Sequence, residues 1–375
     1  MIKNKNKLLL ATSIMATMLV LVSCGKKDSE TASGDRVLNI YNWNDYIDEK
    51  TIPDFEAKTG IKVKYDLFDT NEVVEAKLTA GSSGYDIVVP ASNFMERFVK
   101  AGLVQKLDKS KIPNYKNVDP DFYKNLAQFD PNNEHAINYL WGTTAIGYNV
   151  EKVTKALGTS NIDSWSVLFD PKNAAKLKSC GIGLMDSPPE VIGNALIYLG
   201  FNPNSEKEDE LNKAKDLLKS IAKNVRYFDT ARYINDIANG EICILIGFNG
   251  DVLNAQARAE EAKNNIKIKY LVPKEGAIVW FDTMVIPADA KNVAEAHEFL
   301  NYFLEPETTA RISNHIKFAN SNKASLPLLD KAVAENEAIF PSEAAKAKLV
   351  ALRAYTQEYD RKLTKAWTEI KASTK

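Results

Sequence analysis

Residues that carry most metal and nucleophilic chemistry are scarce in this sequence, whose 375 residues include three cysteines and three histidines. His135 and His315 are isolated, and His297 lies on an amphipathic segment where a solvated position is favoured. The sequence lacks a phosphate-binding loop, a dinucleotide fingerprint, a nucleophile elbow and a metalloprotease helix motif. We therefore expect no metal site and no cofactor, and the corresponding enzyme classes are disfavoured.

The chain also lacks an excess of charge of either sign. Its 48 basic and 49 acidic residues give a formal net charge of −1, so we do not expect a nucleic acid as partner. No internal repeat or low-complexity segment stands out. A hydrophobic fraction of 45% and a charged fraction of 26% are typical of a soluble globular protein. The length favours two domains or lobes with separate cores, and we expect a monomer.

The N-terminal residues have the pattern of an export signal. Three lysines within the first seven residues precede an apolar run at 8–22, whose length of about 15 residues is short for a membrane-spanning helix. The sequence LVSC at 21–24 looks like a bacterial lipobox, in which Cys24 is lipidated and becomes the mature N-terminus. A simple anchor helix is the alternative. It is disfavoured because the small residue and the cysteine come where the apolar run ends.

Residues 24–35 are predicted to be the lipidated N-terminus and a flexible tether. The sequence GKKDSETASGD at 25–35 is polar and has nothing to bury. Removal of the signal peptide at 1–23 takes away three positive charges, which changes the formal charge from −1 to −4. We expect a mildly acidic mature protein in the periplasm or on the outer face of the cytoplasmic membrane, attached to the membrane through lipid at Cys24 alone.

Two cysteines remain once Cys24 is assigned to the anchor. Cys180 and Cys243 are far apart in sequence, so neither a zinc pair nor a redox Cys-x-x-Cys motif is available. In an exported protein the even number favours one disulfide, and two separate buried thiols are the alternative.

Strand and helix patterns alternate after the tether. Strands are predicted at 37–43, 61–65 and 85–89, and helices at 49–59, 72–80 and 94–101. A polar region at 109–134, rich in Pro, Asn and Asp, interrupts this pattern. Residues 139–150 then form a long predicted strand, and Gly142 near its middle suggests a crossing between lobes.

A second set of strands and helices follows. Strands are predicted at 181–185, 242–246, 267–272 and 278–286, and helices near 174–179 and at 191–199, 208–222, 231–239, 293–303 and 342–372. The alternation predicts an α/β fold with a mostly parallel, doubly wound sheet. Because 278–286 is long enough for a return crossing, we expect a clamshell with a ligand cleft between two lobes. The predicted lobes are 36–142 with 283–326, and 143–282 with 327–375.

Acidic residues occur in four loops or crossings of the predicted sheet, and in three of the four an aromatic residue precedes an Asp by two or three residues. The four are WNDY at 43–46, DSPPE at 186–190, FNGD at 248–251 and WFD at 280–282. Open α/β sheets bind ligands beyond the carboxyl ends of their strands. Each loop alone is equally well explained as a turn, with Asp45 as a helix cap. The repetition, and the absence of lysine and arginine from all four, favours a site for a cation.

A linear di- or polyamine would use both kinds of residue. A buried ammonium loses several kcal/mol of hydration unless carboxylates and other acceptors replace its water. Aromatic faces add roughly 0.5–2 kcal/mol each and pack against methylenes. A glycosidase with a carboxylate pair is the best enzyme alternative. It is disfavoured because three or four carboxylates without basic partners exceed what that reaction needs.

Several longer runs carry a resemblance to a known family. They are YNWNDYI (41–47), FEAKTGIKVKYD (55–66), YDIVVP (85–90), TTAIGYNV (143–150), YINDIANGEICILIG (233–247), VPKEGA (272–277) and PADAKN (287–292). Over nearly the whole mature length the chain resembles the substrate-binding proteins of ABC-type polyamine importers, and within them the putrescine-binding type. The resemblance implies a two-lobed periplasmic-binding-protein fold of type II, an ABC permease with its cytoplasmic ATPase as partners, and a disulfide between Cys180 and Cys243.

The resemblance also implies a set of binding residues. They are the carboxylates Asp45, Glu190, Asp251 and Asp282, the methylene-packing rings Trp43 and Trp280, and the further contacts Asn44, Tyr46 and Thr230.

The sequence departs from the family pattern at several binding positions. Phe248 stands where the family usually has Trp, and Phe318 where it usually has Tyr. Ala91 replaces a Ser, for which the adjacent Ser92 could substitute.

The positions that distinguish ligands of different length give conflicting signals. Asp45, Ser187 and Leu352 resemble the putrescine type, whereas Trp280 resembles the spermidine type. We expect putrescine to be preferred. A spermidine-preferring or dual-specificity protein, or a polyamine sensor, is the alternative.

Overall fold

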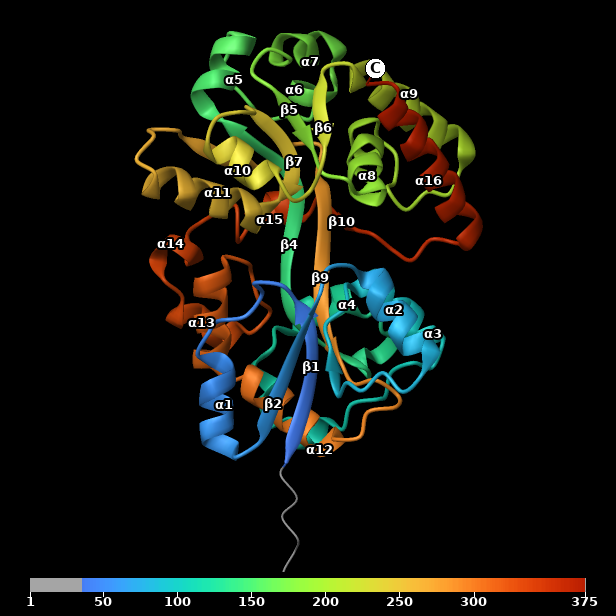
Figure 1. Cartoon of the computed structure of the whole chain (residues 1–375), viewed down its shortest axis with the longest axis vertical. Coiled ribbons are helices and arrows are strands. Elements are labelled where there is room, and N and C mark those ends of the chain that lie inside the picture. The colour runs from blue at the N-terminus through green and yellow to red at the C-terminus, as the bar shows by residue number, and fades with distance from the viewer. Residues whose placement is uncertain (1–35, 375) are drawn as a thin grey trace, which may run out of the picture. The chain divides into compact units, whose positions relative to one another are not determined.

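The computed structural model describes residues 36–374 (Figure 1). The predicted signal peptide, lipidated Cys24 and tether lie outside these residues. The strands of the described part form one sheet in the order β2-β1-β3-β9-β4-β7-β5-β6, with β10 beside β9 and β8 beside β4. Among the described helices, none is both long and apolar enough to cross a membrane.

The elements have the following bounds. The strands are β1 Val37–Trp43, β2 Lys62–Phe68, β3 Ile87–Val88, β4 Ala136–Asn149, β5 Ile182–Leu184, β6 Val225–Phe228, β7 Ile244–Phe248, β8 Ile268–Leu271, β9 Ala277–Val285 and β10 Leu349–Ala351. The α-helices are α1 Thr51–Thr59, α2 Asn71–Ala80, α3 Ser92–Lys100, α4 Pro120–Leu126, α5 Val150–Leu157, α6 Ser166–Phe169, α7 Pro171–Leu177, α8 Pro188–Tyr198, α9 Glu208–Ala222, α10 Tyr233–Ala238, α11 Asn249–Glu261, α12 Val293–Phe303, α13 Pro306–Ile316, α14 Lys331–Ala334, α15 Glu343–Lys346 and α16 Gln357–Ala372. Short 3-10 helices are η1 Lys109–Lys111, η2 Pro113–Asn117, η3 Pro131–Asn133 and η4 Lys323–Leu328.

Two long strands, β4 and β9, run through the middle of the sheet and connect its two ends (Figure 1). They pair antiparallel from Ala136↔Val285 to Thr144↔Ile278, with a register shift between Asn138 and Trp141. At one end β1 pairs in parallel with β2 and β3, and at the other β5 pairs in parallel with β6 and β7. The predicted long strands are therefore present, but the sheet is parallel only toward its ends. The crossing strands make it mixed.

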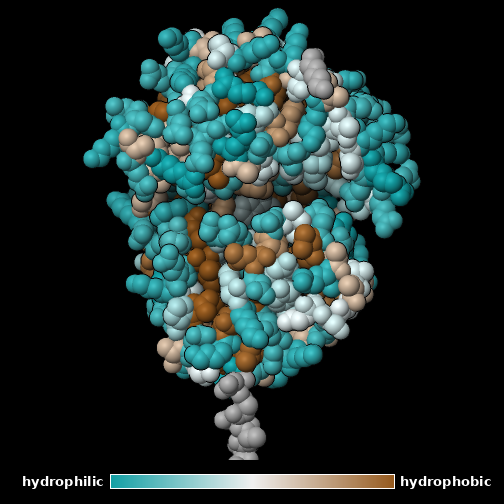
Figure 2. Space-filling model, in the orientation of Figure 1, coloured by the Kyte–Doolittle hydropathy of each residue, from teal (hydrophilic) through white to brown (hydrophobic). Residues whose placement is uncertain are grey.

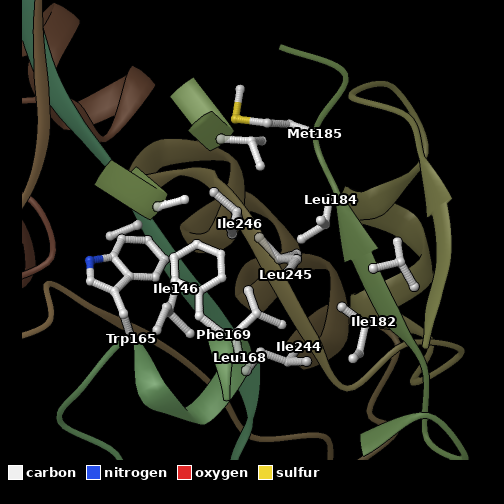
Figure 3. Close-up of a cluster of buried hydrophobic side chains, with 14 of the residues drawn as sticks. Ile146, Trp165, Leu168, Phe169, Ile182, Leu184, Met185, Ile244, Leu245 and Ile246 are labelled. Atoms are coloured by element: carbon white, nitrogen blue, oxygen red, sulfur yellow. The ribbon is translucent and has the colours of Figure 1, made fainter. Parts of the chain in front are cut away.

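The apolar core is divided between the two ends of the sheet. One cluster takes its residues from 145–277 and 359–370, and includes Trp165, Phe169 and Ile182 (Figure 3). Two further clusters draw on residues between 38 and 141 and between 279 and 351. Separate clusters are what two lobes require, because each lobe must bury its own apolar face. The exact lobe boundaries stay a prediction.

The predicted continuous helix at 342–372 is wrong. The chain forms the short helix α15, then β10, and only then α16. Leu349 to Ala351 pair in parallel with Ala277 to Val279 of β9, so the sheet edge satisfies their backbone groups and overrides their helical pattern. The hydroxyl of Thr356 then accepts a hydrogen bond from the backbone N–H of Tyr359 and starts α16.

The prediction also missed several helices. Residues 109–134 contain α4, which Asp119 caps and Pro120 begins. Helix α11 follows β7 without a gap, and its buried face is lined by small residues such as Ala255 and Ala259. Small residues give a weak apolar pattern, which is why α11 did not stand out in the sequence.

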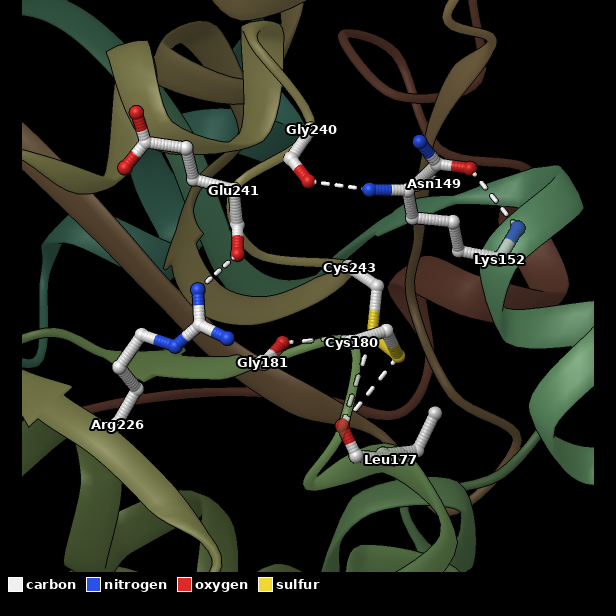
Figure 4. The surroundings of a disulfide bond; sticks show 9 residues. All are labelled: Asn149, Lys152, Leu177, Cys180, Gly181, Arg226, Gly240, Glu241 and Cys243. Carbon is white, nitrogen blue, oxygen red and sulfur yellow. Dashed lines mark hydrogen bonds between the residues drawn. A yellow bond between two sulfur atoms is a disulfide. The ribbon is translucent and has the colours of Figure 1, made fainter.

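A disulfide joins Cys180 and Cys243, with an S–S distance of 2.05 Å and a sequence separation of 63 (Figure 4). It connects the turn after α7 with the residue before β7. The expected pairing is confirmed. The bond encloses α8, α9 and α10 in one covalent loop.

Candidate functional site

Two of the predicted acids lie in the first turns of helices. Glu190 is in the first turn of α8, which follows β5, and Asp251 is in the first turn of α11, which follows β7. Carboxylates are favoured there because the helix N-terminus carries partial positive charge. Because β5 and β7 are parallel neighbours, their carboxyl ends bring both helix starts to the same edge of the sheet.

Asp282 comes from the crossing strand β9 and is only 7% exposed. The hydroxyl of Tyr46 donates a hydrogen bond of 2.8 Å to its Oδ2. The side-chain amide of Asn138 donates to its backbone oxygen at 3.0 Å, and the Tyr139 hydroxyl donates to the backbone oxygen of Tyr46. Burial raises the pKa of Asp282 to about 7, although the hydrogen bond from Tyr46 acts in the opposite direction.

The other two acids are also poorly solvated. Burial raises the pKa of Glu190 to about 7 and that of Asp251 to about 6. The Tyr233 hydroxyl donates a hydrogen bond to Asp251, which lowers its pKa in part, as does the charge of Arg258. Glu190 Oε2 is buried and has no hydrogen-bond partner among the described residues. Both acids therefore have unused capacity to accept hydrogen bonds.

Four aromatic rings form a continuous series beside these acids. The ring centroids of Tyr46 and Phe318 are 5.7 Å apart, those of Phe318 and Trp280 are 5.0 Å apart, and those of Trp280 and Phe248 are 5.8 Å apart. Each pair is nearly perpendicular, with interplanar angles of 77° to 84°. Edge-to-face contacts of this kind fix the rings against one another. The structure thus brings together Tyr46, Phe248, Trp280 and Phe318. Asp282 is hydrogen-bonded to Tyr46.

Two glycines make room for these rings. A Cβ at Gly142 of β4 would overlap the indole ring of Trp280 and the side-chain oxygen of Asn249. A Cβ at Gly250 would overlap the ring of Phe318. Gly250 precedes Asp251, so Phe318 lies directly against the helix start that carries this acid.

Among the described residues, these three acids have no cationic partner. Among the ion pairs formed by residues 36–374, none includes Glu190, Asp251 or Asp282. The acid Asp186 in the loop after β5 differs, because Lys371 pairs with it at 3.0 Å. Buried carboxylates without a counter-ion are costly when ionised. Such a site is suited to a ligand that supplies positive charge.

The first predicted loop is placed differently. Asn44 and Asp45 are exposed, and the Asn44 side chain donates to Asp45 at 3.1 Å. Asp45 has a φ of 50°, a left-handed conformation that Asp tolerates better than most residues. The Trp43 indole donates to the backbone oxygen of Val89 at 2.9 Å and packs on Phe68. The ligand contacts of these residues stay predictions.

The remaining predicted contacts are scattered around the site. Ser92 is buried at the start of α3. Thr230 accepts a hydrogen bond of 3.0 Å from the backbone N–H of Asp186. Leu352 is buried against Ile197 and Ile278. Their roles, too, stay predictions.

Sequence reasoning missed Tyr233, which holds Asp251, and Thr144, whose side chain lies close enough to Glu190 to lower its pKa. The signal for Thr144 was available, since Thr143 and Thr144 are polar residues within an otherwise apolar strand.

Figure 2 shows a hollow across the middle of one face of the described residues, between the two ends of the sheet. Within residues 36–374, no group of three or more His, Cys, Asp or Glu could hold a metal ion.

A cavity of about 540 Å³ has one face of the crossing strands in its wall. Trp141, Val279 and Phe281 line it, and they are sequence neighbours of Gly142, Trp280 and Asp282. Because strand side chains alternate between faces, this cavity and the side chains of Trp280 and Asp282 lie on opposite sides of the sheet.

Comparison with known proteins identifies the family. Residues 50–341 match the family described as bacterial extracellular solute-binding protein. The chain belongs to this family of bacterial extracellular solute-binding proteins. This solute-binding protein is 48% identical over 363 residues to the putrescine-binding periplasmic protein PotF of Escherichia coli, with 96% of this chain and 97% of PotF covered. It is 46% identical over 358 residues to the putrescine-binding periplasmic protein SpuD of Pseudomonas aeruginosa, with 95% and 98% covered.

A solved structure supports the same assignment. The spermidine/putrescine ABC transporter substrate-binding protein PotD of Streptococcus pneumoniae has a TM-score of 0.79 and 29% sequence identity to this solute-binding protein. The match covers 91% of this chain and all of that chain. The predicted two-lobed fold of type II is confirmed. The family and these relatives are binding proteins, in agreement with the prediction that this solute-binding protein is not an enzyme.

Proposed function

We propose that this protein binds a linear polyamine outside the cytoplasm, with putrescine preferred, and delivers it to an ABC permease powered by a cytoplasmic ATPase. The observation that carries the proposal is the group of three poorly solvated acids, Glu190, Asp251 and Asp282, without basic partners among residues 36–374, beside a series of aromatic rings. The names of PotF and SpuD, both putrescine-binding, support the same ligand.

The chemistry of a diamine matches the two kinds of residue. Each ammonium is a donor with three N–H groups and needs acceptors, which the carboxylates supply. The methylenes between them pack against Trp280, Phe248 and Phe318, and ring faces also attract the charge. Trp43, Asn44, Asp45, Tyr46, Ser92, Thr230 and Leu352 are further proposed contacts. No bond is made or broken.

A ligand held from both ends of the crossing strands would also favour closure. Tyr46, which is hydrogen-bonded to Asp282, packs in the cluster that includes Tyr139, whereas Glu190 and Asp251 lie at the start of helices that pack in the cluster of Trp165. A dication between them neutralises acids that otherwise repel one another. Hinge closure around a ligand is a common motion in two-lobed binding proteins.

Spermidine is the second candidate ligand. The presence of Trp280, which resembles the spermidine type, and the name of the Streptococcus pneumoniae relative favour it. A sensor that presents its closed state to a signalling receptor would use the same residues. A gene neighbourhood with a permease and an ATPase would favour transport.

Calorimetric titration of the purified protein with putrescine, cadaverine, spermidine and spermine tests the proposal. We expect the tightest binding for putrescine. Tightest binding of spermidine would replace the ligand while keeping the class. Absence of binding to all four amines would refute the proposed function.

The proposed membrane attachment has a separate test. Residues 1–23 would be removed as a signal peptide, and lipid on Cys24 would hold a monomer at the membrane surface. The wild-type protein should partition into a detergent phase, and a Cys24→Ser variant into the aqueous phase. Equal partitioning of the two would refute lipidation at Cys24.

A further inference from the structure

Two buried asparagines lie on the helices that carry the candidate acids. Asn194 is in α8, one turn after Glu190, and Asn249 is the first residue of α11, two residues before Asp251. Both side chains are fully buried, with exposed fractions of 0%. A buried amide needs partners for its donors and its acceptor, so the bonds that it makes define its role.

Asn194 joins α8 to both crossing strands. Its Nδ2 donates to the backbone oxygen of Thr144 at 3.1 Å and to that of Glu190 at 3.0 Å. Its Oδ1 accepts from the backbone N–H of Ile278 at 3.2 Å. Thr144 of β4 and Ile278 of β9 are partners in the sheet register. One amide therefore satisfies a backbone group on each crossing strand.

Asn249 joins α11 to β4, at the residue before Thr144. Its Oδ1 accepts from the backbone N–H of Thr143 at 3.2 Å, and its Nδ2 donates to the backbone oxygen of Ala338 at 2.9 Å. Its Oδ1 also lies against Gly142, on which the indole ring of Trp280 rests. Asn249 therefore links the start of α11 to the part of β4 that supports Trp280.

We propose that Asn194 and Asn249 are positioning residues that fix the spacing of Glu190, Asp251 and Trp280, and so set the length of diamine that the site accepts. This inference rests on the proposed function. Both amides act at adjacent residues, Thr143 and Thr144, so the two acid-bearing helices are attached to β4 at one point. An aspartate could not replace Asn194, because a carboxylate oxygen would face the carbonyl oxygens of Thr144 and Glu190.

Selectivity for chain length depends on this rigidity. One methylene more or less changes affinity by about 10- to 200-fold in a pocket of fixed dimensions. Without its amide, a helix leaves buried backbone groups of β4 unpaired, and it can shift until they find other partners. The acid on that helix would shift with it, so diamines of neighbouring lengths would be bound more equally.

The test is a calorimetric titration of Asn194→Ala and Asn249→Ala with 1,3-diaminopropane, putrescine and cadaverine. Asn149→Ala is the matched control. Asn149 is also a buried asparagine of β4, but it lies at the far end of this strand, where it caps α5. We compare the affinity for the preferred diamine with that for the diamine one methylene longer or shorter. We expect the ratio of these two affinities to fall about tenfold in both test variants. The ratio should stay unchanged in the control.

A conservative variant keeps the inference testable if an alanine variant does not fold. Asn249→Gln keeps the amide but displaces it by one methylene, and it too should change the ratio. Equal losses of affinity for all three diamines, with an unchanged ratio, would overturn the inference while the proposed function stands. Failure of the wild-type protein to bind any of the three would overturn the inference, and failure to bind spermidine and spermine as well would overturn the proposed function.

Discussion

The pKa values of individual carboxyl groups in this protein depend on the groups that surround them. Burial without a cation raises the pKa values of Glu190, Asp251 and Asp282. Burial acts in the same direction on Asp86 and Glu96, but hydrogen bonds from neighbouring donors outweigh it and hold their pKa values below the ordinary range. We propose that the first group accepts a cation from the ligand, whereas the second is already satisfied by the protein.

Replacing one acid of the first group should weaken binding strongly. We expect Asp251→Asn to weaken putrescine binding by about 2–5 kcal/mol, because the ligand loses one partner of a buried charged pair. Calorimetry measures the change. Asp186→Asn is the matched control, since Asp186 follows β5 but is paired with Lys371. Unchanged affinity in Asp251→Asn would mean that Asp251 does not contact the ligand.

Binding should also depend on pH through the raised pKa values. The ammonium groups favour ionised carboxylates, so binding lowers the pKa values of Glu190 and Asp282 from about 7 and releases protons. Affinity should therefore rise from about pH 6 to about pH 8, about one unit to either side of these values.

The proton count gives an independent measure of this linkage. Titration in buffers of different ionisation enthalpy should show proton release at pH 7, and less of it in Asp282→Asn. Tyr46→Phe is a useful companion, because it removes the hydrogen bond that lowers the pKa of Asp282 but leaves the carboxyl group in place. A flat pH profile in the wild-type protein would contradict the assignment of these acids.

Acidic and aromatic residues of the candidate site were predicted from the sequence, but the contacts that these residues make could not be predicted. Aromatic and acidic residues at strand ends indicated a cation site. The sequence could not indicate that Asp45 would be exposed whereas Tyr46, its neighbour, would be buried against Asp282. Such placement depends on tertiary contacts, here with Tyr139 and Phe318, that lie far away in sequence.

At the scale of elements, the crossing strand β4 supports the indole of Trp280 through Gly142. We expect Gly142→Ala to cost about 1–3 kcal/mol of binding free energy, because the added methyl overlaps the ring. Titration with putrescine measures the change. Trp280→Phe in the same variant removes part of the overlapping ring and should restore some affinity. Gly102→Ala is the control and should reduce the stability of the fold without changing the affinity for putrescine. A Cβ there meets no atom within 4 Å, and Gly102 lies at φ +66°.

The disulfide should contribute strongly to stability. Cys180 and Cys243 are separated by 63 residues, and closing a loop of this length stabilises the folded state by about 4 kcal/mol. Denaturant unfolding of a Cys180→Ala, Cys243→Ala variant should show a loss of this size. Added reductant should destabilise the wild-type protein and have no effect on the variant. Identical unfolding of the two proteins would contradict this expectation.

Elements with strong local patterns were predicted well. Strand β1 and helices α9 and α12 have the predicted bounds. The errors occur where sheet pairing overrides local preference, as in β10, or where small residues hide a helix face, as in α11. The antiparallel pairing of β4 with β9 was not predicted either, because the sequence of a strand does not specify the direction of its partner.

At the scale of the whole molecule, the segment that follows β10 connects the two core regions. Arg353 donates from Nε and Nη2 to the buried carboxylate of Glu96 on α3, and the backbone N–H of Ala354 donates to the same group. On the other side, the side chain of Asn204, between α8 and α9, bonds to the backbones of Arg353 and Ala351. The two core regions are thus connected by this segment as well as by the two crossing strands.

Loss of this connection should destabilise the protein. We expect Glu96→Gln to lower the free energy of unfolding by about 1–3 kcal/mol at pH 7, because hydrogen bonds to a charged acceptor are lost. The folded-state pKa of Glu96 is lowered, so its contribution is present above the unfolded pKa and is lost as pH falls through the folded value. Thermal unfolding should therefore show a difference between variant and wild type that shrinks in acid.

The exposed Glu335 provides a control for this prediction. It pairs with Lys331 at the surface, where ion pairs contribute little. Glu335→Gln should leave the unfolding temperature nearly unchanged at every pH. A difference between Glu96→Gln and wild type that persists in acid would contradict the role of the Glu96 charge.

The alternation of side chains along β9 limits how the ligand preference can change in evolution. Trp280 and Asp282 face the proposed site, whereas Val279 and Phe281 face the cavity on the other side of the sheet. Deleting or inserting one residue in β9 would exchange the two sets and place a carboxylate where apolar side chains now pack. Point substitutions at Trp280 or Asp282 are therefore open to natural selection, whereas changes in the length of β9 are not.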